Sequence, residues 1–299
     1  MIVAIGISFL TFLITYMAPG DPVRIMFSAT GMAPSEELVQ ETREAMGLNR
    51  PVLVQFKDWL FNCLHGDFGM SYSLKRPVVE LLAGRFWPTM KLSLFSLVLM
   101  LAIAVPIGMM QATHKNSVVD YLLRGVTFFG VSMPNFWVGL IFMMIFCVRL
   151  KLLPVVSSAG DFKSLILPAV TLAFAMSAKY TRQVRTAIVE ELNQDYVIGA
   201  RARGVAEWRI LWLNVFPNSL LPLITMLGLS LGSLLGGTAV VEVIFTYPGL
   251  GNLAVSAITA YDYPLIQGYV LWISFIYMAV NLLVDISYNY VDPRMREKR

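Results

Sequence analysis

The stretch Asp195–Pro222 reads DYVIGARARGVAEWRILWLNVFPNSLLP and joins two long apolar segments of the chain. Its first half is rich in small residues, and Val205, Trp208 and Trp212 follow at helical spacing on one face. This pattern predicts a short exposed helix, then a second helix whose apolar face lies against a helical bundle. A helix that touches only lipid headgroups needs the same aromatic and basic residues. Composition alone therefore leaves these two interpretations equally open.

The apolar segments around this stretch predict an all-α, polytopic membrane protein. Of the 299 residues, 57% are hydrophobic and 14% are charged, whereas soluble domains average roughly 45–50% apolar and about 25% charged residues. A spanning helix needs about 20 mostly apolar residues. Six segments meet or nearly meet this requirement, at residues 1–18, 88–112, 122–149, 165–180, 218–246 and 265–291. The first lacks the flanks of a signal peptide, so we expect a membrane anchor there.

The distribution of Lys and Arg predicts the orientation of these six spans. The loop near 247–264 has none, whereas the C-terminal tail and the loop near 180–216 are basic. The basic residues assigned to that loop are Lys179, Arg182, Arg185, Arg201, Arg203 and Arg209. Because cytoplasmic loops carry an excess of Lys and Arg, we expect both termini to be cytoplasmic. The predicted organisation is a first transmembrane helix at 1–18, an external segment at 19–87, a transmembrane domain at 88–291 with a cytoplasmic loop at 181–217, and a cytoplasmic tail at 292–299.

The external segment contains two predicted helices. Ser35 can cap a helix over residues 35–46, whose first turn is acidic. An amphipathic pattern predicts a second helix over residues 52–64. Residues 19–34 are rich in Gly and Pro, so we expect an extended lead-in there.

The sequence lacks the motifs of several chemistries. The dipeptide Gly-Lys does not occur, so there is no P-loop and we do not expect this chain to hydrolyse ATP. It contains no H-E-x-x-H or G-x-S-x-G motif, and its two histidines lie outside the apolar segments, so we predict no catalytic residue and no metal site. The net charge of +4 comes without a basic cluster and does not indicate nucleic-acid binding. Cys63 and Cys147 form no C-x-x-C pair, and we expect two free thiols.

Four glycines form a stripe in the fifth predicted span. Gly228, Gly232 and Gly236 repeat at four-residue spacing, and Gly237 reinforces the stripe. Without side chains, two helix backbones can approach closely in lipid. The motif alone favours ordinary packing within this chain.

Polar residues inside the spans are candidates for the transport pathway, because polar groups in hydrocarbon are costly. In the third span, Ser132, Pro134 and Asn135 predict a structural kink with satisfied polar groups, in preference to a patch that faces a pathway. Glu242, near the outer end of the fifth span, is equally compatible with a structural and a functional role. For Arg124, we expect a long side chain that reaches the membrane interface.

The stretch Asp195–Pro222 resembles the EAA loop of ABC importer permeases. In that pattern a small-residue triplet is followed four residues later by Gly, and then by a hydrophobic-Pro pair. The corresponding residues here are Ile198, Gly199 and Ala200, then Gly204, then Phe216 and Pro217. Ile198 stands where the pattern has an acidic residue, which affects individual contacts rather than the role.

Further stretches resemble one branch of these permeases in order and spacing. They are MAPGDP (17–22), GLNRPVLVQFKDWL (47–60), GDFGMSYSLKRPV (66–78), VSMPNFW (131–137), GGTAVVEVIFTYPGLG (236–251), DYPLIQ (262–267) and DPR (292–294). Together they extend along almost the whole chain. The sequence is thus similar to the dipeptide, oligopeptide and nickel permease family of binding-protein-dependent ABC importers.

This resemblance implies a type I ABC importer transmembrane fold in the bacterial inner membrane. It implies a cytoplasmic coupling helix that inserts into a cleft on a separate ATPase subunit. The implied coupling residues are Gly199, Ala200, Arg201, Ala202, Arg203, Gly204, Glu207 and Pro217. The implied partners are a second homologous permease, two ABC ATPase subunits that use ATP, an extracytoplasmic substrate-binding protein and membrane lipid. The family binds no cofactor of its own, and its fifth helix, which carries the glycine stripe, lines the pathway.

The resemblance implies import of di- or oligopeptides, with nickel or a metal chelate as the alternative cargo, because selectivity resides mostly in the binding protein. A stand-alone, ion-coupled secondary transporter is a second alternative. The sequence shows neither the inverted repeat nor the broken helices that are typical of that class. A structural or assembly protein of the membrane would also tolerate the glycine stripe and the intramembrane polar residues.

Overall fold

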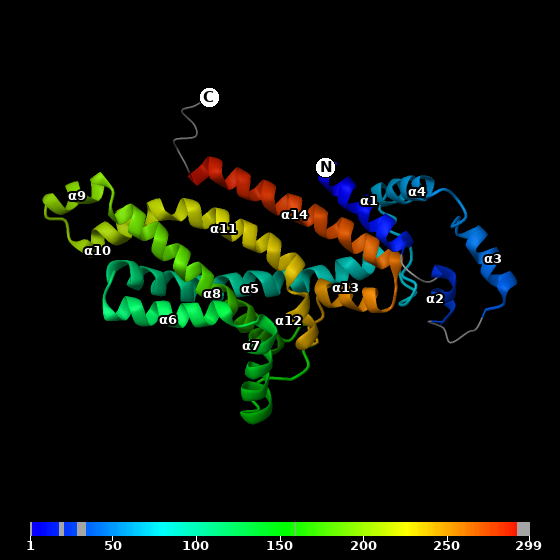
Figure 1. Cartoon of the computed structure of the whole chain (residues 1–299), viewed down its shortest axis with the longest axis horizontal. Helices are drawn as coiled ribbons and strands as arrows, with labels where there is room; N and C mark the ends of the chain where they lie inside the picture. The colour runs from blue at the N-terminus through cyan, green and yellow to red at the C-terminus, as the bar shows by residue number, and fades with distance from the viewer. Residues whose placement is uncertain (1, 18–20, 29–33, 159, 292–299) are drawn as a thin grey trace. The chain divides into compact units, whose positions relative to one another are not determined.

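The computed structural model describes residues 2–17, 21–28, 34–158 and 160–291. The tail 292–299 with its DPR motif, and parts of the MAPGDP motif and of the predicted lead-in, lie outside these residues. Within them the chain is helical (Figure 1), and one isolated antiparallel bridge pairs Met70 with Pro77. The all-α prediction is therefore confirmed for the described part of the chain.

The helices follow one another along the chain, with the longer connections at residues 65–77 and 150–161. They are α1 (Ile2–Met17), α2 (Pro22–Ser28), α3 (Glu36–Ala45), α4 (Val52–Leu64), α5 (Val78–Thr113), α6 (Val118–Ser132), α7 (Asn135–Phe142), η1 (Met143–Arg149), α8 (Phe162–Leu192), α9 (Asp195–Ala202), α10 (Glu207–Arg209), η2 (Ile210–Val215), α11 (Phe216–Gly237), α12 (Ala239–Ile244), α13 (Leu250–Thr259) and α14 (Tyr263–Val291). The segments η1 and η2 are π-helical and continue α7 and α10. The chain forms two compact units: unit 1 is residues 1–89 and 248–277, and unit 2 is residues 90–247 and 278–299.

Among the described residues, five helical segments at most have the length and composition of membrane spans. The helices α5 and α8 and residues 263–286 of α14 qualify singly. Two bent pairs qualify together, residues 118–130 with 135–149 and residues 207–220 with 222–236. These five correspond to the second to sixth predicted spans, and the first corresponds to α1, a shorter apolar helix over its described residues. The fourth predicted span is only part of α8, because the helix continues to Leu192 and carries three basic residues that we had assigned to a loop.

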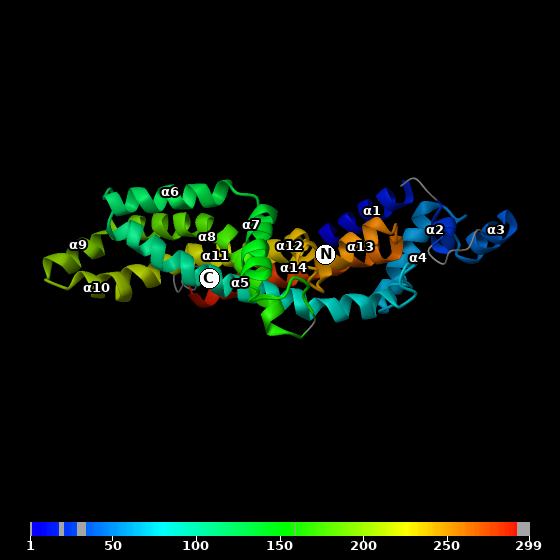
Figure 2. The same cartoon turned by 90° about the horizontal axis from the view of Figure 1, so that it is seen from below.

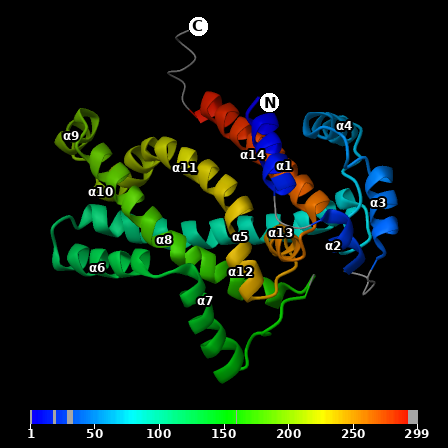
Figure 3. The same cartoon turned by 45° about the vertical axis from the view of Figure 1, so that its right-hand side comes forward.

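The third predicted span is broken, whereas only a kink was predicted. The helix α6 ends at Ser132 and α7 begins at Asn135, with 96° between the two parts of the span (Figure 3). Between them Met133 is extended, with φ −86° and ψ 130°, because a residue before proline is pushed out of the helical region. The expectation that the chain has no broken helix is therefore wrong.

Residues 22–28 form a helix, so the extended lead-in predicted over 19–34 is wrong there. The side chain of Asp21 accepts a hydrogen bond from the Val23 amide at 3.0 Å, as an N-cap residue does. Pro22 then occupies the first helical position, where its missing N–H costs nothing. Proline in this stretch starts a helix instead of preventing one.

The two helices predicted for the external segment are confirmed. The helix α3 begins after Ser35, whose hydroxyl accepts a hydrogen bond from the Leu38 amide at 3.3 Å. The helix α4 covers the predicted amphipathic stretch.

A buried carboxylate of unit 1 ties a turn within residues 19–87 to the start of α14. Asp262 has no exposed surface and accepts hydrogen bonds from the hydroxyls of Ser71 (2.5 Å) and Ser73 (2.7 Å). It also accepts the amides of Tyr72 (3.1 Å) and Ser73 (2.9 Å), and that of Leu265 in the first turn of α14 (3.4 Å). The turn at residues 71–73 and the start of α14 are thus tied at one point, although they are far apart in sequence.

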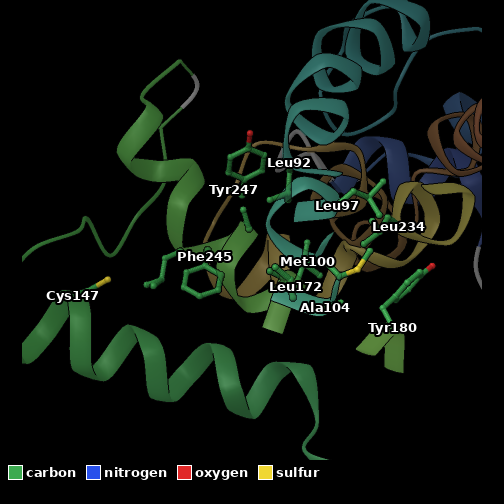
Figure 4. Close-up of a cluster of buried hydrophobic side chains, with 14 residues drawn as sticks. Leu92, Leu97, Met100, Ala104, Cys147, Leu172, Tyr180, Leu234, Phe245 and Tyr247 are labelled. Carbon is green, nitrogen blue, oxygen red and sulfur yellow. The ribbon is translucent and has the colours of Figure 1, made fainter. Parts of the chain in front are cut away.

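The apolar core of unit 2 includes residues of α5, α8, α11 and α12. Figure 4 shows Met100 of α5 beside Leu172 of α8 in this cluster, which also contains the buried rings of Phe245 and Tyr247. The helix α6 packs along α8 (Figure 2). This packing positions the segment at residues 195–215, because α8 leads directly into α9 and η2 leads directly into α11.

Candidate functional site

The predicted coupling segment folds as a short helix and a tight turn between α8 and α11 (Figure 3). The helix α9 stops before Gly204, which has φ +75°. The Gly204 amide donates to the Arg201 carbonyl at 2.9 Å, and the Val205 amide donates to the Ala200 carbonyl at 3.2 Å. These two bonds are the Schellman closure of a helix by a left-handed residue. Glycine fixes the turn because an L side chain is strained at this φ.

One face of α9 is anchored in unit 2. Val197 and Ala200 are buried in an apolar cluster built from five helical segments. The other members of the cluster include Met109 of α5, Val184 and Ile188 of α8, Ile210 and Val215 of η2, and Leu223 of α11. Because packed interiors are dense and hardly compressible, a displacement of α9 is transmitted to these helices.

The opposite face of the turn is exposed. Ile198 is 57% exposed, and Ala202 and Arg203 are exposed beside it. The Arg201 guanidinium donates two hydrogen bonds to the Glu207 carboxylate, at 2.7 and 3.2 Å, and so bridges the two sides of the turn. The remaining predicted coupling residues are Gly199, partly buried in α9, and Pro217, exposed in the first turn of α11.

Of the two interpretations that the sequence left open for the second half of the segment, packing of its apolar face on the bundle is wrong, and contact with lipid headgroups stays a prediction. Val205, Trp208 and Trp212 were expected to pack on the bundle, but the two tryptophans are 60% and 52% exposed. Ile210 and Val215 are buried instead. The segment η2 is π-helical, and its buried residues Ile210 and Val215 are five apart, as the wider turn of a π-helix allows.

A buried ion-pair cluster joins α6 to α8. Asp120 has no exposed surface and binds Arg124 of its own helix and Arg185 of α8, whose Nε and Nη2 donate at 3.1 and 3.0 Å. The amide of Asn116 donates to the same carboxylate at 3.0 Å. Arg124 thus forms an ion pair while its side chain is 40% exposed, and its position at the membrane interface stays a prediction. Sequence analysis missed the cluster, because only the Asp120–Arg124 spacing is local and Arg185 lies 65 residues from Asp120.

The helix break lies beside a polar cavity of about 230 Å³ in unit 2. Its polar lining consists of Asn135 at the start of α7, Lys179 and Tyr180 of α8, and Ser230 and Ser233 of α11. The Tyr180 hydroxyl donates to a carbonyl of α11 at 2.7 Å and contacts the Ser230 hydroxyl, which joins α8 to α11 at the cavity wall. Sequence analysis did not assign Lys179 or Tyr180 to any site.

The three polar candidates at the break are in different situations. Asn135 is exposed to the cavity. Ser132 donates to the Phe128 carbonyl at 3.0 Å, so its hydroxyl is satisfied within α6. Pro134 precedes α7 with φ −65°. Of these three residues, Asn135 is the one that lines the cavity.

The glycines of the fifth span do not share one packing contact. A Cβ atom built on Gly228 would lie 1.9 Å from Val284 Cγ2 of α14, so this glycine permits close packing within the chain. A Cβ on Gly236 would have no neighbour within 4 Å. Gly232 is buried, and Gly237 ends α11.

Glu242 is a fully buried carboxylate in α12. Its carboxylate accepts a hydrogen bond from the Thr238 hydroxyl at 2.9 Å, and its backbone carbonyl accepts one from the Tyr247 amide at 2.7 Å.

Within the ranges that the structure describes, no three His, Cys, Asp or Glu side chains are grouped to hold a metal ion. Cys63 and Cys147 are buried free thiols.

Comparison with known proteins shows the family. The family model described as "binding-protein-dependent transport system inner membrane component" matches residues 104–297, and the model of the N-terminal part of such components matches residues 1–93. The probable D,D-dipeptide transport system permease protein DdpB of Escherichia coli K12 is 36% identical, over 99% of this chain and 94% of that protein. The glutathione transport system permease protein GsiC of the same strain and the metal-staphylopine import system permease protein CntB of Staphylococcus aureus are each 36% identical, over 98% of this chain and 94% of theirs.

The fold is also that of a solved transporter. An inward-facing structure of the MetNI methionine ABC transporter matches with a TM-score of 0.61 and 16% identity, over 71% of this chain and 96% of that one. The type I ABC importer transmembrane fold expected from the sequence is thereby confirmed. The chain belongs to the family of binding-protein-dependent transport system inner membrane components, and it is a membrane-spanning permease subunit of an ABC importer.

Proposed function

We propose that this chain imports di- or oligopeptides as one of two permease subunits, driven by two separate ATPases that grip the turn at residues 195–209. The observation that carries the proposal is the form of this turn in a chain of the permease family. Its outer face is exposed while its inner face is buried in the bundle. An exposed surface of this kind, with small residues and a glycine-fixed bend, suits insertion into a cleft on another protein.

The internal bracing of the turn supports a mechanical role. The Arg201–Glu207 ion pair and the left-handed Gly204 hold its shape. Val197 and Ala200 connect it to the helices of unit 2. When ATP closes the partner ATPases, α9 moves with them, the helices of unit 2 follow, and the path opens outward. Hydrolysis then resets the subunits.

The external side receives the cargo in this proposal. An extracytoplasmic binding protein docks on residues 19–87 and 247–264, and both termini are cytoplasmic, as the Lys and Arg distribution favours. The hydrogen bonds of Asp262 support such a role, because they join both docking segments into one surface.

Peptides are the cargo that the relatives favour. The two Escherichia coli relatives are named for a dipeptide and for glutathione, and the Staphylococcus aureus relative is named for a metal chelate. A metal chelate is thus the alternative cargo for the same machine. The broken span at residues 132–135 is a feature that ion-coupled transporters share, so an experiment has to separate ATP from ion coupling.

The test is uptake into proteoliposomes. The chain is reconstituted alone, or with its second permease, its two ATPases and the binding protein, and labelled peptide uptake is measured with and without internal ATP. We expect uptake only in the complete, ATP-loaded vesicles. Uptake by the chain alone, or uptake that disappears on collapsing the proton gradient at constant ATP, would show that the chain is a secondary transporter.

A further inference from the structure

The cavity beside the helix break is lined in part by side chains whose hydrogen-bond donors are not engaged by the protein. The hydroxyl proton of Tyr180 goes to a carbonyl of α11, so Ser230 donates its own proton to Tyr180. Ser233 donates to the Ser230 carbonyl at 2.9 Å. In the described part of the chain, the lining side chains with unengaged N–H donors are Lys179 and Asn135.

Lys179 differs from the nearby arginines of unit 2. Arg124 and Arg185 both bind the buried Asp120. Lys179 forms no ion pair or hydrogen bond with any described residue, although it lies on the same helix as Arg185. Lys179 belongs to α8, a helix with the length and composition of a membrane span. A cation without a carboxylate partner on such a helix is a candidate for function.

The start of α7 adds positive potential to the same cavity. Asn135 is the first residue of α7, which continues into η1. The unpaired N–H groups of a helix N-terminus carry partial positive charge. Half-helices that begin at a break inside the membrane commonly direct this end at anionic groups of a transported substrate. Two features, namely the Lys179 ammonium group and the start of α7 with its Asn135 amide, therefore favour an anion at one place.

We propose that this cavity binds a carboxylate of the cargo during passage, with the Lys179 ammonium and the Asn135 amide as donors. The inference rests on the proposed import function. An ionised carboxylate only accepts hydrogen bonds, and charge-assisted bonds to it are strong. Peptides carry a C-terminal carboxylate, and chelators of divalent metals also bind through carboxylates. The site thus serves either cargo class, and it adds a permease contact to the selectivity of the binding protein.

The experiment uses the complete importer in proteoliposomes with internal ATP and an equimolar library of unmodified dipeptides. Mass spectrometry measures the peptides that accumulate inside at subsaturating concentration. We expect Lys179→Gln to lower uptake roughly 10- to 100-fold, the range for one charge-assisted hydrogen bond, and Lys179→Arg to retain most of it. Lys163→Gln, an exposed lysine at the start of α8, is the matched control and should transport as the wild type.

Chemical rescue separates charge from shape. Lys179→Cys treated with 2-aminoethyl methanethiosulfonate regains a cation and should regain uptake, whereas the 2-sulfonatoethyl reagent should not restore it. Wild-type rates in Lys179→Gln, or equal rescue by both reagents, would overturn the proposal in favour of a lysine that only reaches the interface. A Lys179→Gln chain that no longer co-purifies with the second permease would also overturn it, by assigning Lys179 to the subunit interface. Absence of ATP-dependent uptake in the wild type would contradict the import function itself.

Discussion

The substitution Asp262→Asn tests how the turn at residues 71–73 is held against the start of α14. The carboxylate accepts five hydrogen bonds at a site with no exposed surface. An asparagine has nearly the same shape, but one of its two positions is an NH₂ group that cannot accept. The substitution therefore removes acceptors without creating a cavity, and its effect is that of the lost hydrogen bonds.

The magnitude follows from which donors lose their partner. The Oδ2 position faces the hydroxyls of Ser71 and Ser73 and the Ser73 amide. The Oδ1 position faces the amides of Tyr72 and Leu265. Hydroxyls can rotate and accept, so the less costly orientation places NH₂ at the Oδ2 position and strands one backbone amide. One stranded buried donor costs about 1–3 kcal/mol, which corresponds to a roughly 5- to 150-fold larger open population of the turn.

Hydrogen exchange of the peptide that covers residues 66–78 measures this population directly. We expect the Tyr72 and Ser73 amides to exchange roughly 5- to 150-fold faster in Asp262→Asn, because their protection depends on the closed turn. Asp67→Asn is the matched control, since Asp67 is exposed and its carboxylate accepts the amide of nearby Gly69 within the described part of the chain. Exchange of the two amides at the wild-type rate in Asp262→Asn would refute the reasoning.

Three further predictions concern other parts of the chain. Asp120→Asn leaves two guanidinium groups without their carboxylate, so it should destabilise the protein by about 3–5 kcal/mol. The loss should appear as a lower thermal unfolding midpoint in detergent, and an unchanged midpoint would contradict the ion-pair cluster. Gly228→Ala should lower the free energy of unfolding by about 1–3 kcal/mol, because the new Cβ meets Val284. Gly236→Ala should change the free energy of unfolding by less than about 0.5 kcal/mol. Equal effects of the two substitutions would disprove this distinction. Burial, and to a smaller extent the charge of Asp67, raises the pKa of the Cys63 thiol to about 12. Maleimide should therefore label Cys63 slowly at pH 7 until the protein unfolds. Rapid labelling of the native protein would contradict the burial of this thiol.

Local signals were sufficient where a single residue determines the backbone. Ser35 predicted the start of α3, and its hydroxyl caps that helix. Gly204 was identified from the resemblance, and its φ of +75° gives the physical reason for a glycine there. The helix α2 was missed because Gly and Pro were interpreted as breakers, although Asp21 followed by Pro22 is also a helix start.

The helix break and the packing of η2 show where periodicity misleads. Pro134 predicted a kink, but the extended residue before it separates two helices at 96°. The four-residue spacing of Trp208 and Trp212 predicted a buried face, but a π-helical segment turns differently, and Ile210 is buried instead. A sequence pattern assumes a regular helix, and both errors occur where the helix is irregular.

Long-range polar contacts had no sequence signal. Asp262 binds a turn 190 residues away, and Asp120 binds Arg185 65 residues away. The polar cavity likewise needs α7, α8 and α11 to be brought together before Asn135 and Lys179 become neighbours. Such sites depend on the tertiary fold, and a single sequence shows only their separate parts.

Site-specific cross-linking at the coupling turn tests the central claim most directly. Arg203→Cys keeps the backbone relaxed, because Arg203 is exposed with φ −82°, and the native cysteines are buried. A photoactivatable maleimide on this cysteine should capture an ABC ATPase subunit in native membranes, and the same label on Leu152→Cys, an exposed residue in the loop after η1, should not. If the Arg203→Cys label never captures an ATPase while the chain remains assembled in the membrane, the turn at residues 195–209 is not the contact that drives transport.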